Sequence, residues 1–475
     1  MDEFEVVIGL EVHVELLTKT KMFCGCSTKF GSPPNSQVCP ICTGMPGVLP
    51  VINKKAVELA IKTGIAFNSR ISRFCRFARK NYFYPDLPKN YQISQYDQPI
   101  ATGGFLEIDG KKINFKRIHL EEDAGKLLHS EGTLISYVDF NRSGIPLLEM
   151  VTEPDIRSPE EAEKFLEKLK VILEYLEISD CNMEEGSLRC DANISVRRKG
   201  EKTLGVKTEV KNMNSFKSVR KALSYESNRQ IDILKKGGKV IQETRLWNEK
   251  EGITEEMRTK EEAHDYRYFP EPDLLPLEID TKWIEEIKKE IKELPDERKE
   301  RFKTEYGLSD YDSNILISQK GIADYFEECV KLYKNSKTVA NWIIGEILAY
   351  VKGKILKADE ILLKPEYLAE ILKLIDDGKI TQNIGKEILK EIYGKGIRPL
   401  DIIKKRDLIQ IKDEEVLLKV AQEVIKENEK AVSDWKKGKE QVIGYLLGQI
   451  MRKTGGKANP NLAKEILIEC LKKLK

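Results

Sequence analysis

Residues 8–16 read IGLEVHVEL, a stretch in which apolar side chains alternate with other residues at a period of two. This alternation predicts a β-strand with one buried face, and hence a half-buried sheet near the N-terminus. The opposite face carries Glu11, His13 and Glu15, in a chain with only four histidines among 475 residues. Two carboxylates thus bracket an imidazole. The face is either an ordinary solvated surface or part of a binding site.

Residues 1 to about 275 combine short strand-like runs, many turn signals and a few helical segments. Within GFLEIDGKKINFKRIHL (104–120), Asp109-Gly110 predicts a two-residue hairpin turn. Ser158-Pro159 with Glu160 and Glu161 predicts a helix start. An apolar stripe follows at Phe165, Leu166, Leu169, Ile172, Leu173 and Leu176. The fold class is therefore α+β around an antiparallel sheet.

From about Trp283 onward, strand patterns give way to Lys/Glu-rich helical periodicity. Near the end, Gly455-Gly456 predicts the end of one helix and Asn459-Pro460 the start of the next. We expect three domains: a sheet domain over 1–290, a helical body over 291–405 and a small helical tail over 406–475.

Composition limits the class of protein. With 40% hydrophobic and 33% charged residues, the chain is expected to be soluble and globular. The net charge of +2 creates no global attraction to nucleic acid, so any RNA contact must use local basic surfaces. We find no signal peptide and no segment long enough to cross a bilayer, and the expected location is the cytoplasm without a membrane contact.

Four of the nine cysteines lie in FCGCSTKFGSPPNSQVCPICTG (23–44). Cys24 with Cys26, and Cys39 with Cys42, form two close pairs joined by a turn-rich loop. Four thiolates can surround Zn²⁺ tetrahedrally, which fills the metal's coordination shell and indicates a structural role. The alternatives are four unrelated buried thiols or a redox pair at Cys39 and Cys42.

Acidic side chains recur in turn-flanked stretches of the sheet domain. Together with the strand at 8–16, several carboxylates and an imidazole suit a hard cation such as Mg²⁺. Ordinary solvated surface groups are an equally weighted alternative. The candidates are His119, Glu121, Glu122, Asp123, Glu149, Glu153, Asp155, Glu184, Glu185, Asp191 and Asn193.

RKNYFYPDLPKNYQISQYDQP (79–99) interleaves five aromatic rings with Lys80 and Lys89. Rings that stack on a base, beside ammonium groups that meet phosphates, fit a nucleotide or a tRNA end. An aromatic mini-core beneath a loop is the competing interpretation. The sequence contains neither a P-loop nor the glycine- and serine-rich nucleophile segment of an amidase.

Taken together, the motifs resemble the B subunits of the aspartyl/glutamyl-tRNA(Asn/Gln) amidotransferase family nearly from end to end. Related archaeal proteins carry an inserted domain that this chain lacks. The strings that carry the resemblance are IGLEVHVEL, RKNYFYPDLPKNYQISQ, HLEEDAGK, EPDIRSPEEA, EEGSLRCDANIS, VKNMNSF, DYRYFPEPDL and GQIMRKTGGKANP.

The resemblance implies a cradle-shaped α+β domain followed by a helical body and a small helical tail. It also implies a carbon–nitrogen ligase with glutamine as amide donor. ATP phosphorylates the side-chain carboxyl of glutamate or aspartate misacylated on tRNA(Gln) or tRNA(Asn), and ammonia then displaces the phosphate. The implied partners are a glutaminase (amidase) subunit, which releases the ammonia, and a third, small subunit of the same complex.

The family's catalytic metal positions map here to Glu11, His13, Glu122 and Glu149, and less clearly to Asp191. The implied cofactors are ATP and Mg²⁺, beside the Zn²⁺ expected from the cysteines. Lys80, Tyr82 and Lys89 are expected to bind ATP or the tRNA 3′ end, and Arg452, Lys453 and Lys457 the outer tRNA body. A non-catalytic zinc-containing tRNA-binding protein is the second hypothesis. A ligase acting on free amino acid is the third.

Overall fold

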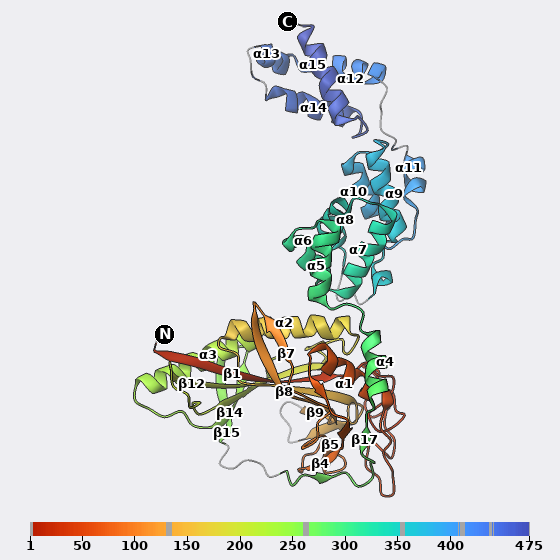
Figure 1. Cartoon of the computed structure of the whole chain (residues 1–475). Coiled ribbons are helices and arrows are strands. Elements are labelled where there is room, and N and C mark those ends of the chain that lie inside the picture. The colour runs from red at the N-terminus through yellow and green to blue at the C-terminus, as the bar shows by residue number, and fades with distance from the viewer. Residues whose placement is uncertain are drawn as a thin grey trace. The chain divides into compact units, whose positions relative to one another are not determined.

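The computed structural model describes residues 3–129, 135–259, 266–351, 357–406, 408, 414–436, 439 and 441–474. The chain divides into two compact units, Met1–Pro295 and Asp296–Lys475 (Figure 1). The first unit holds all the described strands and the second is helical. The α+β class is thereby confirmed.

A ten-stranded sheet is the frame of the first unit, and the opening stretch lies at its centre. That stretch is part of β1 (Phe4–Glu15), which pairs antiparallel with β11 (Pro146–Thr152) and β12 (Leu188–Arg198). Next to β11 comes β8 (Lys111–Glu122), followed by β6 (Ala101–Thr102) and β2 (Arg70–Ile71), while β7 (Phe105–Ile108) pairs with β8. Beyond β12 come β13 (Thr208–Lys211), β14 (Glu243–Asn248) and β15 (Ile253–Thr259). The sheet is antiparallel except for the parallel pair β13 and β14.

One face of this sheet is apolar because period two sends Ile8, Leu10, Val12 and Val14 of β1 to the same side, where all are buried. They join one core with side chains of four helices. The helices are α1 (Lys54–Ala66), α2 (Pro159–Tyr175), α3 (Phe216–Lys235) and α4 (Thr281–Glu290). Figure 1 shows α2 and α3 lying along one side of the sheet. The other face of β1 is thus left for its polar side chains.

The local signals read from the sequence are confirmed. Ser158 caps α2 by accepting a hydrogen bond from the Glu161 amide, and Pro159 is its first residue. Asp109 and Gly110 both have positive φ, 49° and 79°, between β7 and β8. That backbone conformation is the one a two-residue hairpin turn requires.

Smaller elements complete the first unit. β4 (Ala78–Asn81), β5 (Tyr91–Ser94) and β16 (Phe269–Pro270) form a three-stranded sheet in the order β16-β4-β5. Two further pairs are β3 (Phe74–Cys75) with β17 (Leu277–Glu278), and β9 (Lys126–His129) with β10 (Ser136–Asp139). Helix α4 (Thr281–Glu290) lies near the end of the unit.

The second unit begins with α5 (Pro295–Tyr306), α6 (Asp310–Ile317), α7 (Lys320–Leu332) and α8 (Ser336–Trp342). A π-helical turn (Ile343–Ile347), a 3₁₀ turn (Ala358–Glu360), α9 (Pro365–Asp376), α10 (Gln382–Ile392) and α11 (Pro399–Arg406) follow. The last four helices are α12 (Glu414–Glu427), α13 (Glu429–Lys436), α14 (Val442–Lys453) and α15 (Pro460–Lys472), with α12, α14 and α15 sharing a separate apolar core. Asn459 caps α15 as expected. Among the described helices, none combines the length and apolar character that spanning a bilayer requires.

Candidate functional site

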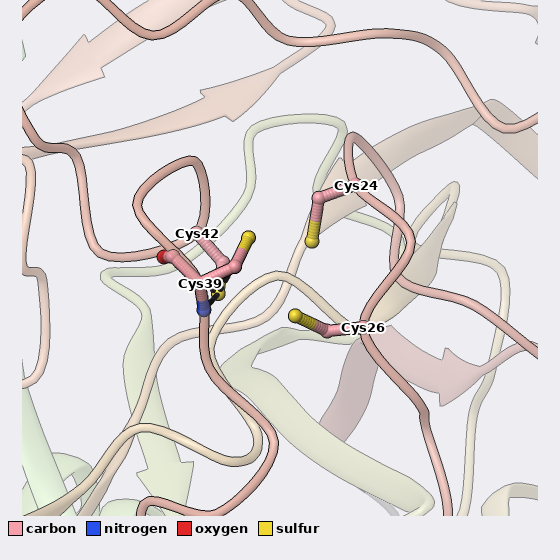
Figure 2. Close-up of side chains that lie close together, drawn as sticks. All are labelled: Cys24, Cys26, Cys39 and Cys42. Atoms are coloured by element: carbon pink, nitrogen blue, oxygen red, sulfur yellow. Dashed lines mark hydrogen bonds between the residues drawn. The ribbon is translucent and has the colours of Figure 1, made fainter.

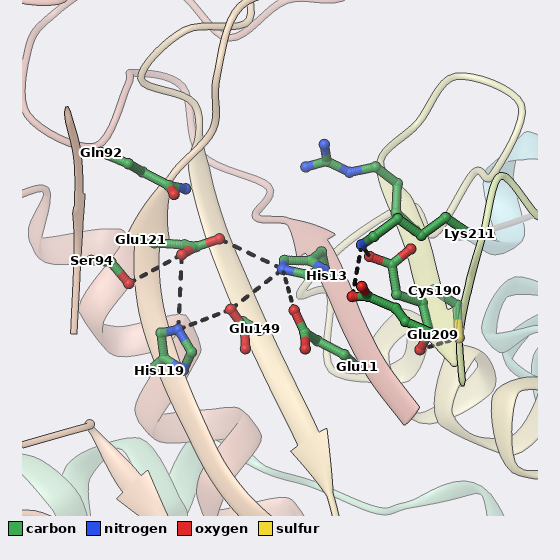
Figure 3. Close-up of polar contacts among 12 residues, drawn as sticks. Glu11, His13, Gln92, Ser94, His119, Glu121, Glu149, Cys190, Glu209 and Lys211 are labelled. Atoms are coloured by element: carbon green, nitrogen blue, oxygen red, sulfur yellow. Dashed lines mark hydrogen bonds and ion pairs between the residues drawn. The ribbon is translucent and has the colours of Figure 1, made fainter. Parts of the chain in front are cut away.

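The polar face of the central sheet carries a row of facing side chains. In the strand register, His13 of β1 lies opposite Glu149 of β11, which lies opposite His119 of β8. On its other side, His13 lies opposite Arg189 of β12. Because paired positions in adjacent strands share a face, the register alone brings two imidazoles to one carboxylate. Figure 3 shows these groups pointing toward one another.

Two carboxylates and two imidazoles form the centre of this row. His119 Nε2 lies 3.1 Å from Glu149 Oε2, and His13 Nε2 lies 3.4 Å from the same oxygen. Glu121, two residues beyond His119, lies 3.7 Å from His13 and accepts a hydrogen bond of 3.1 Å from Ser94 Oγ. Glu121 and Glu149 are both almost fully buried. Buried carboxylates need a compensating charge or a metal, so this is a built site and not a solvated surface.

Burial and the neighbouring charges together determine how these groups ionise. Burial acts against the charge on both imidazoles, but Glu149 and Glu121 outweigh it and raise the pKa of His119 to about 9. The same carboxylates raise the pKa of His13. Burial also acts against the charge on Glu149, yet the positive His119 and His13 hold its pKa well below the usual range. The side chains of the site therefore form a network of paired charges.

Glu11 lies at the edge of this network. Its Oε1 is 3.7 Å from His13 Nε2, and burial together with the charge of Glu149 raises its pKa. Glu11, His13 and Glu149 can each offer a ligand atom, all within 4.8 Å of one another, and so can His119, Glu121 and Glu149. Three of the expected metal ligands are thus together.

Asp191 is opposite Glu11 in β12, but its carboxylate pairs with the ammonium of Lys211. Glu15 faces Asp123, and burial followed by that neighbouring charge raises the pKa of Glu15 to about 8. Neither residue belongs to the ligand groups formed in the described part of the chain. Both lie on the margin of the cluster.

Glu122 is the expected ligand that the structure does not bring to His13. Alternation along β8 points Glu121 into the cluster and sends Glu122 elsewhere. There the Glu122 carboxylate pairs with the ammonium of Lys89 and accepts a 3.0 Å hydrogen bond from the Ile93 amide. In position, Glu121 takes the place that we expected Glu122 to have.

Lys80 lies on the cluster side of β4. Burial opposes its charge, but Glu121, the tyrosine Tyr268 and Glu149 outweigh this effect and raise the pKa of its ammonium group. Lys80 Nζ lies 5.9 Å from the centre of the Tyr82 ring, and burial raises the pKa of Tyr82 to about 12. Two of the three expected nucleotide-binding residues, Lys80 and Tyr82, therefore lie together, whereas Lys89 pairs with Glu122.

The four cysteines form a second cluster, shown in Figure 2. Their sulfurs all lie within 4.8 Å of one another, drawn from two loops, Cys24 and Cys26 on one and Cys39 and Cys42 on the other. Such spacing suits a tetrahedral metal with four thiolate ligands. The positions of the four sulfurs therefore agree with the cluster that the cysteine spacing predicted.

Lys21 is a neighbour of this cluster that the sequence did not single out. It is only 1% exposed, and its Nζ lies 3.6 Å from Cys42 Sγ and donates to the Phe140 carbonyl at 3.2 Å. A hydrogen bond from Cys24, and also the charge of Lys21, lower the pKa of Cys42. A cavity of about 210 Å³ between this cluster and the Lys89–Glu122 pair is also lined by Lys21.

In the second unit, α14 and the loop after it carry the three expected tRNA contacts. Arg452 is exposed, and Lys457 is partly buried after the Gly455-Gly456 turn. Lys453 Nζ pairs with Glu427 at 2.6 Å and Glu423 at 3.0 Å, so its charge is partly neutralised within the unit. The three cations are close in sequence but differ in exposure, and Lys453 is paired with two glutamates.

Several residues of the site were not assigned a role from the sequence. His119 and Glu121 were noted as candidates, and only the pairing of β8 with β11 brings them to His13. Lys21 ends a short polar run, TKTK (18–21), that is typical of a surface. Tyr266 and Tyr268 lie far along the chain from Lys80, and periodicity carries no signal for a contact at that separation.

Comparisons with known proteins identify the family of the chain. Residues 6–285 match the family described as GatB/GatE catalytic domain, and residues 324–471 match the GatB domain. The chain is thus of the class of amidotransferase subunits that carry this catalytic domain. It belongs to the family of aspartyl/glutamyl-tRNA(Asn/Gln) amidotransferase B subunits.

Curated relatives that carry this family name match throughout. The B subunit of Caldicellulosiruptor bescii is 56% identical over 479 residues, covering 99% of this chain and 100% of the relative. Those of Caldanaerobacter subterraneus and Carboxydothermus hydrogenoformans are each 55% identical, covering 99% and 100% of this chain and 100% of each relative.

Proposed function

We propose that this chain activates and amidates the side-chain carboxyl of glutamate on tRNA(Gln), of aspartate on tRNA(Asn), or of both. In the first step a carboxylate oxygen attacks the γ-phosphorus of ATP, and ADP leaves. In the second, ammonia attacks the carbonyl carbon of the acyl phosphate, a proton is lost from nitrogen, and inorganic phosphate leaves. The product is the amide on the tRNA.

The observation that carries this proposal is the buried cluster of Glu121, Glu149, His13 and His119. Phosphoryl transfer asks a protein mainly to position its reactants and to stabilise the charge on the transferred group. Carboxylates and imidazoles that form two groups with ligand atoms within 4.8 Å of one another suit a metal-assisted reaction, whereas a surface that only binds tRNA needs cations for its phosphates. The cluster therefore favours catalysis over a non-catalytic tRNA-binding role.

The donor set fits a divalent cation that accepts oxygen ligands and an imidazole, such as Mg²⁺. The buried Nδ1 atom of His119 finds no hydrogen-bond partner among the described residues, whereas Nε2 of the same ring faces Glu149. Glu11, His13, Glu121 and Glu149 would hold the ion, with Glu121 in the place first expected for Glu122. When bound, Mg²⁺ would neutralise charge on the phosphates.

Lys80 supplies a further positive charge at this site. Its ammonium is held on the same side as Glu121 and Glu149 and is protonated at neutral pH. It can therefore meet the γ-phosphate or the substrate carboxylate, while Tyr82 beside it offers a ring for a base. Lys89 is the less direct candidate because Glu122 already holds its charge.

Ammonia must come from elsewhere, because the sequence contains no nucleophile segment of an amidase. We assign its release from glutamine to a separate glutaminase subunit, with a third, small subunit completing the complex. Because the substrates are ATP and charged tRNA, we assign the reaction to the cytoplasm. The outer tRNA body is assigned to Arg452, Lys453 and Lys457.

The test uses the complex with its partner subunits on glutamyl-tRNA(Gln) and aspartyl-tRNA(Asn), with hydroxylamine added to trap the acyl phosphate as a hydroxamate. Hydroxylamine also cleaves the aminoacyl ester and gives an α-hydroxamate without ATP, so the diagnostic product is the side-chain γ- or β-hydroxamate, which we expect to require both ATP and Mg²⁺. Glu149→Gln should abolish it, while glutamine hydrolysis by the partner persists. Complexes that bind tRNA but form no side-chain hydroxamate would support the non-catalytic hypothesis. Turnover without tRNA would support the free amino-acid ligase.

The cysteine cluster is assigned separately to one structural Zn²⁺. A closed four-thiolate shell leaves no open position for substrate. We expect about one zinc per chain by elemental analysis. Cys39→Ser should lower zinc content and thermal stability, whereas Cys470→Ser, in the second unit, should leave zinc content unchanged. Metal-free wild-type protein with four titratable thiols would contradict this assignment.

A further inference from the structure

The segment from Tyr266 to Asp273 lies along β4 as an added edge strand. Phe269 and Pro270, which form β16, pair with Arg79 and Ala78 of β4. Before β16, the Asn81 amide donates to the Tyr266 carbonyl at 2.9 Å, and Asn81 Nδ2 donates to the Arg267 carbonyl at 2.9 Å. Backbone contacts thus hold the segment on both sides of Tyr268.

An ion pair locks the register of this segment. Arg79 donates to both carboxylate oxygens of Glu271, at 2.6 and 2.8 Å, and to Asp273 at 3.2 Å. Glu271 is only 3% exposed, and the Arg79 guanidinium also lies 4.3 Å from the centre of the Tyr91 ring. A planar two-point contact permits one relative position of the two groups. The side chains that precede Glu271 are therefore placed with respect to β4.

The result is a chain of four tyrosine rings around Lys80. Tyr82 packs edge-on against Tyr266 at 5.6 Å, Tyr266 against Tyr268 at 5.9 Å, and Tyr268 stacks on Tyr96 at 4.0 Å. Lys80 Nζ lies 5.0 Å from the centre of the Tyr266 ring, closer than its 5.9 Å from Tyr82. An ammonium group at that distance from a ring is attracted to its face.

Lysine otherwise has a flexible stem, and ordering that stem costs rotamer entropy. Charges that are already in place when a reaction begins stabilise the transition state without reorganisation. A ring that restricts Lys80 therefore lowers the cost of using its charge.

We propose that Tyr266 is a positioning residue of the active site, supported by Tyr268, and that it holds the Lys80 ammonium toward Glu121 and Glu149. This inference rests on the proposed function, in which Lys80 meets the phosphate or carboxylate of a substrate. It makes the segment 266–273 part of the site.

The first test measures ATP-dependent amidation by the reconstituted complex. Tyr266→Leu removes the ring, and kcat/KM for ATP should fall about tenfold, as expected for a desolvated cation–π contact. Tyr266→Phe keeps the ring and should restore activity to within about twofold. Tyr311→Leu, an exposed tyrosine of the second unit, is the matched control and should leave the rate unchanged.

The second measurement reports the position of Lys80 without turnover. After reductive methylation with ¹³C-formaldehyde, the Lys80 methyl signal should be shifted upfield by the rings, and Lys80→Arg identifies it. The shift should be lost in Tyr266→Leu and kept in Tyr266→Phe. Tyr266→Leu that keeps both the shift and wild-type kcat/KM would overturn the proposal.

Two further measurements cover the case in which Tyr266→Leu does not fold and the case in which the proposed function fails. If Tyr266→Leu does not fold, pentafluorophenylalanine at position 266 keeps the ring's shape but reverses its electrostatics, and should reproduce the loss of activity. Wild-type rates for that variant would equally overturn the proposal. If the wild-type complex forms no acyl phosphate, the proposed function fails, while the methyl shift still reports whether Tyr266 positions Lys80.

Discussion

Glu121 and Glu122 are neighbours in β8 that meet different surroundings, so their substitution separates two roles. Glu121→Gln should lower amidation by at least about 100-fold and weaken the response to Mg²⁺, because a buried ligand charge is lost. Glu122→Gln should act through Lys89, which loses its partner, and leave the Mg²⁺ dependence unchanged. Titration of activity against Mg²⁺ with the two variants checks this.

Partner glutaminase activity is the internal control for these variants, because both leave the glutaminase untouched. If Glu122→Gln shifted the Mg²⁺ requirement and Glu121→Gln did not, the ligand assignment would return to Glu122. The alternation of a strand would then have to be broken near the end of β8.

Gly44, in the loop that carries Cys39 and Cys42, lies directly against Lys89. Its φ is +68°, and a Cβ atom there would lie 2.3 Å from Lys89 Cγ and 3.3 Å from Lys89 Cα. Gly47 has a similar φ of +84°, but a Cβ atom there would meet open space within the described part of the chain. Gly44→Ala and Gly47→Ala should each cost about 1 kcal/mol of backbone strain.

Only Gly44→Ala also places a methyl group against Lys89, and this overlap should lower the free energy of unfolding by a further amount of about 1–3 kcal/mol. Denaturant unfolding of the zinc-loaded protein measures the difference between the two variants. Equal stabilities would mean that the loop moves away from Lys89 freely. The cysteine loop would then not hold that lysine.

At the scale of elements, Glu249 joins the end of β14 to the start of α3. It accepts hydrogen bonds from Lys221 at 2.8 Å, from Trp247 Nε1 at 2.5 Å and from Ser218 at 2.7 Å, which together lower its pKa to about 2. A carboxyl with a lowered folded-state pKa stabilises the fold above its unfolded value of about 4.5. That contribution is lost as pH falls through about 2.

Glu249→Gln should therefore destabilise the protein at pH 6 and make less difference at pH 2. Because the carboxylate is largely exposed, solvent screening keeps the effect at pH 6 small. Unfolding followed by far-ultraviolet circular dichroism at the two pH values measures this. Glu251→Gln, an exposed neighbour, is the control, and an equal effect of both variants at pH 6 would exclude the proposed junction.

Local elements could be predicted well because their signals are local. Alternation in residues 8–16 predicted β1, the Ser158-Pro159 signal predicted α2, and Asp109-Gly110 predicted the β7–β8 turn. The parallel pair β13 and β14 was not predicted. Strand direction depends on the connection through α3, and the residues of the two strands do not encode it.

The site could be predicted only in part, because several of its contacts join residues that are far apart in the sequence. Close spacing predicted the cysteine cluster, whose sulfurs come together. Which of the two adjacent glutamates faces His13 depends on how β8 pairs with β11, and that is a long-range property. The approach of Tyr266 to Lys80 goes together with the Arg79–Glu271 pair, whose residues are 192 apart in the chain. No periodicity reports such a contact.

At the scale of the molecule, the carboxylate–imidazole cluster belongs to one compact unit and Arg452 to the other. Arg452→Ala should therefore raise the KM for charged tRNA severalfold and leave kcat at saturation unchanged. Because a phosphate contact releases counterions, the slope of log affinity against log salt should fall by about 1. Lys334→Ala, an exposed lysine outside the tail, is the control. A lower kcat with unchanged KM would contradict the division of roles.

The central place of β1 has a consequence for how the chain is made. Its sheet partners are residues 146–152 and 188–198, so this strand leaves the ribosome long before its first neighbour and longer still before its second. Contacts of such sequence separation form slowly, and an unpaired apolar strand invites aggregation in the meantime. Nascent chains shorter than about 200 residues should therefore be chaperone clients, since the strand that bears His13 keeps at least one unpaired edge until then.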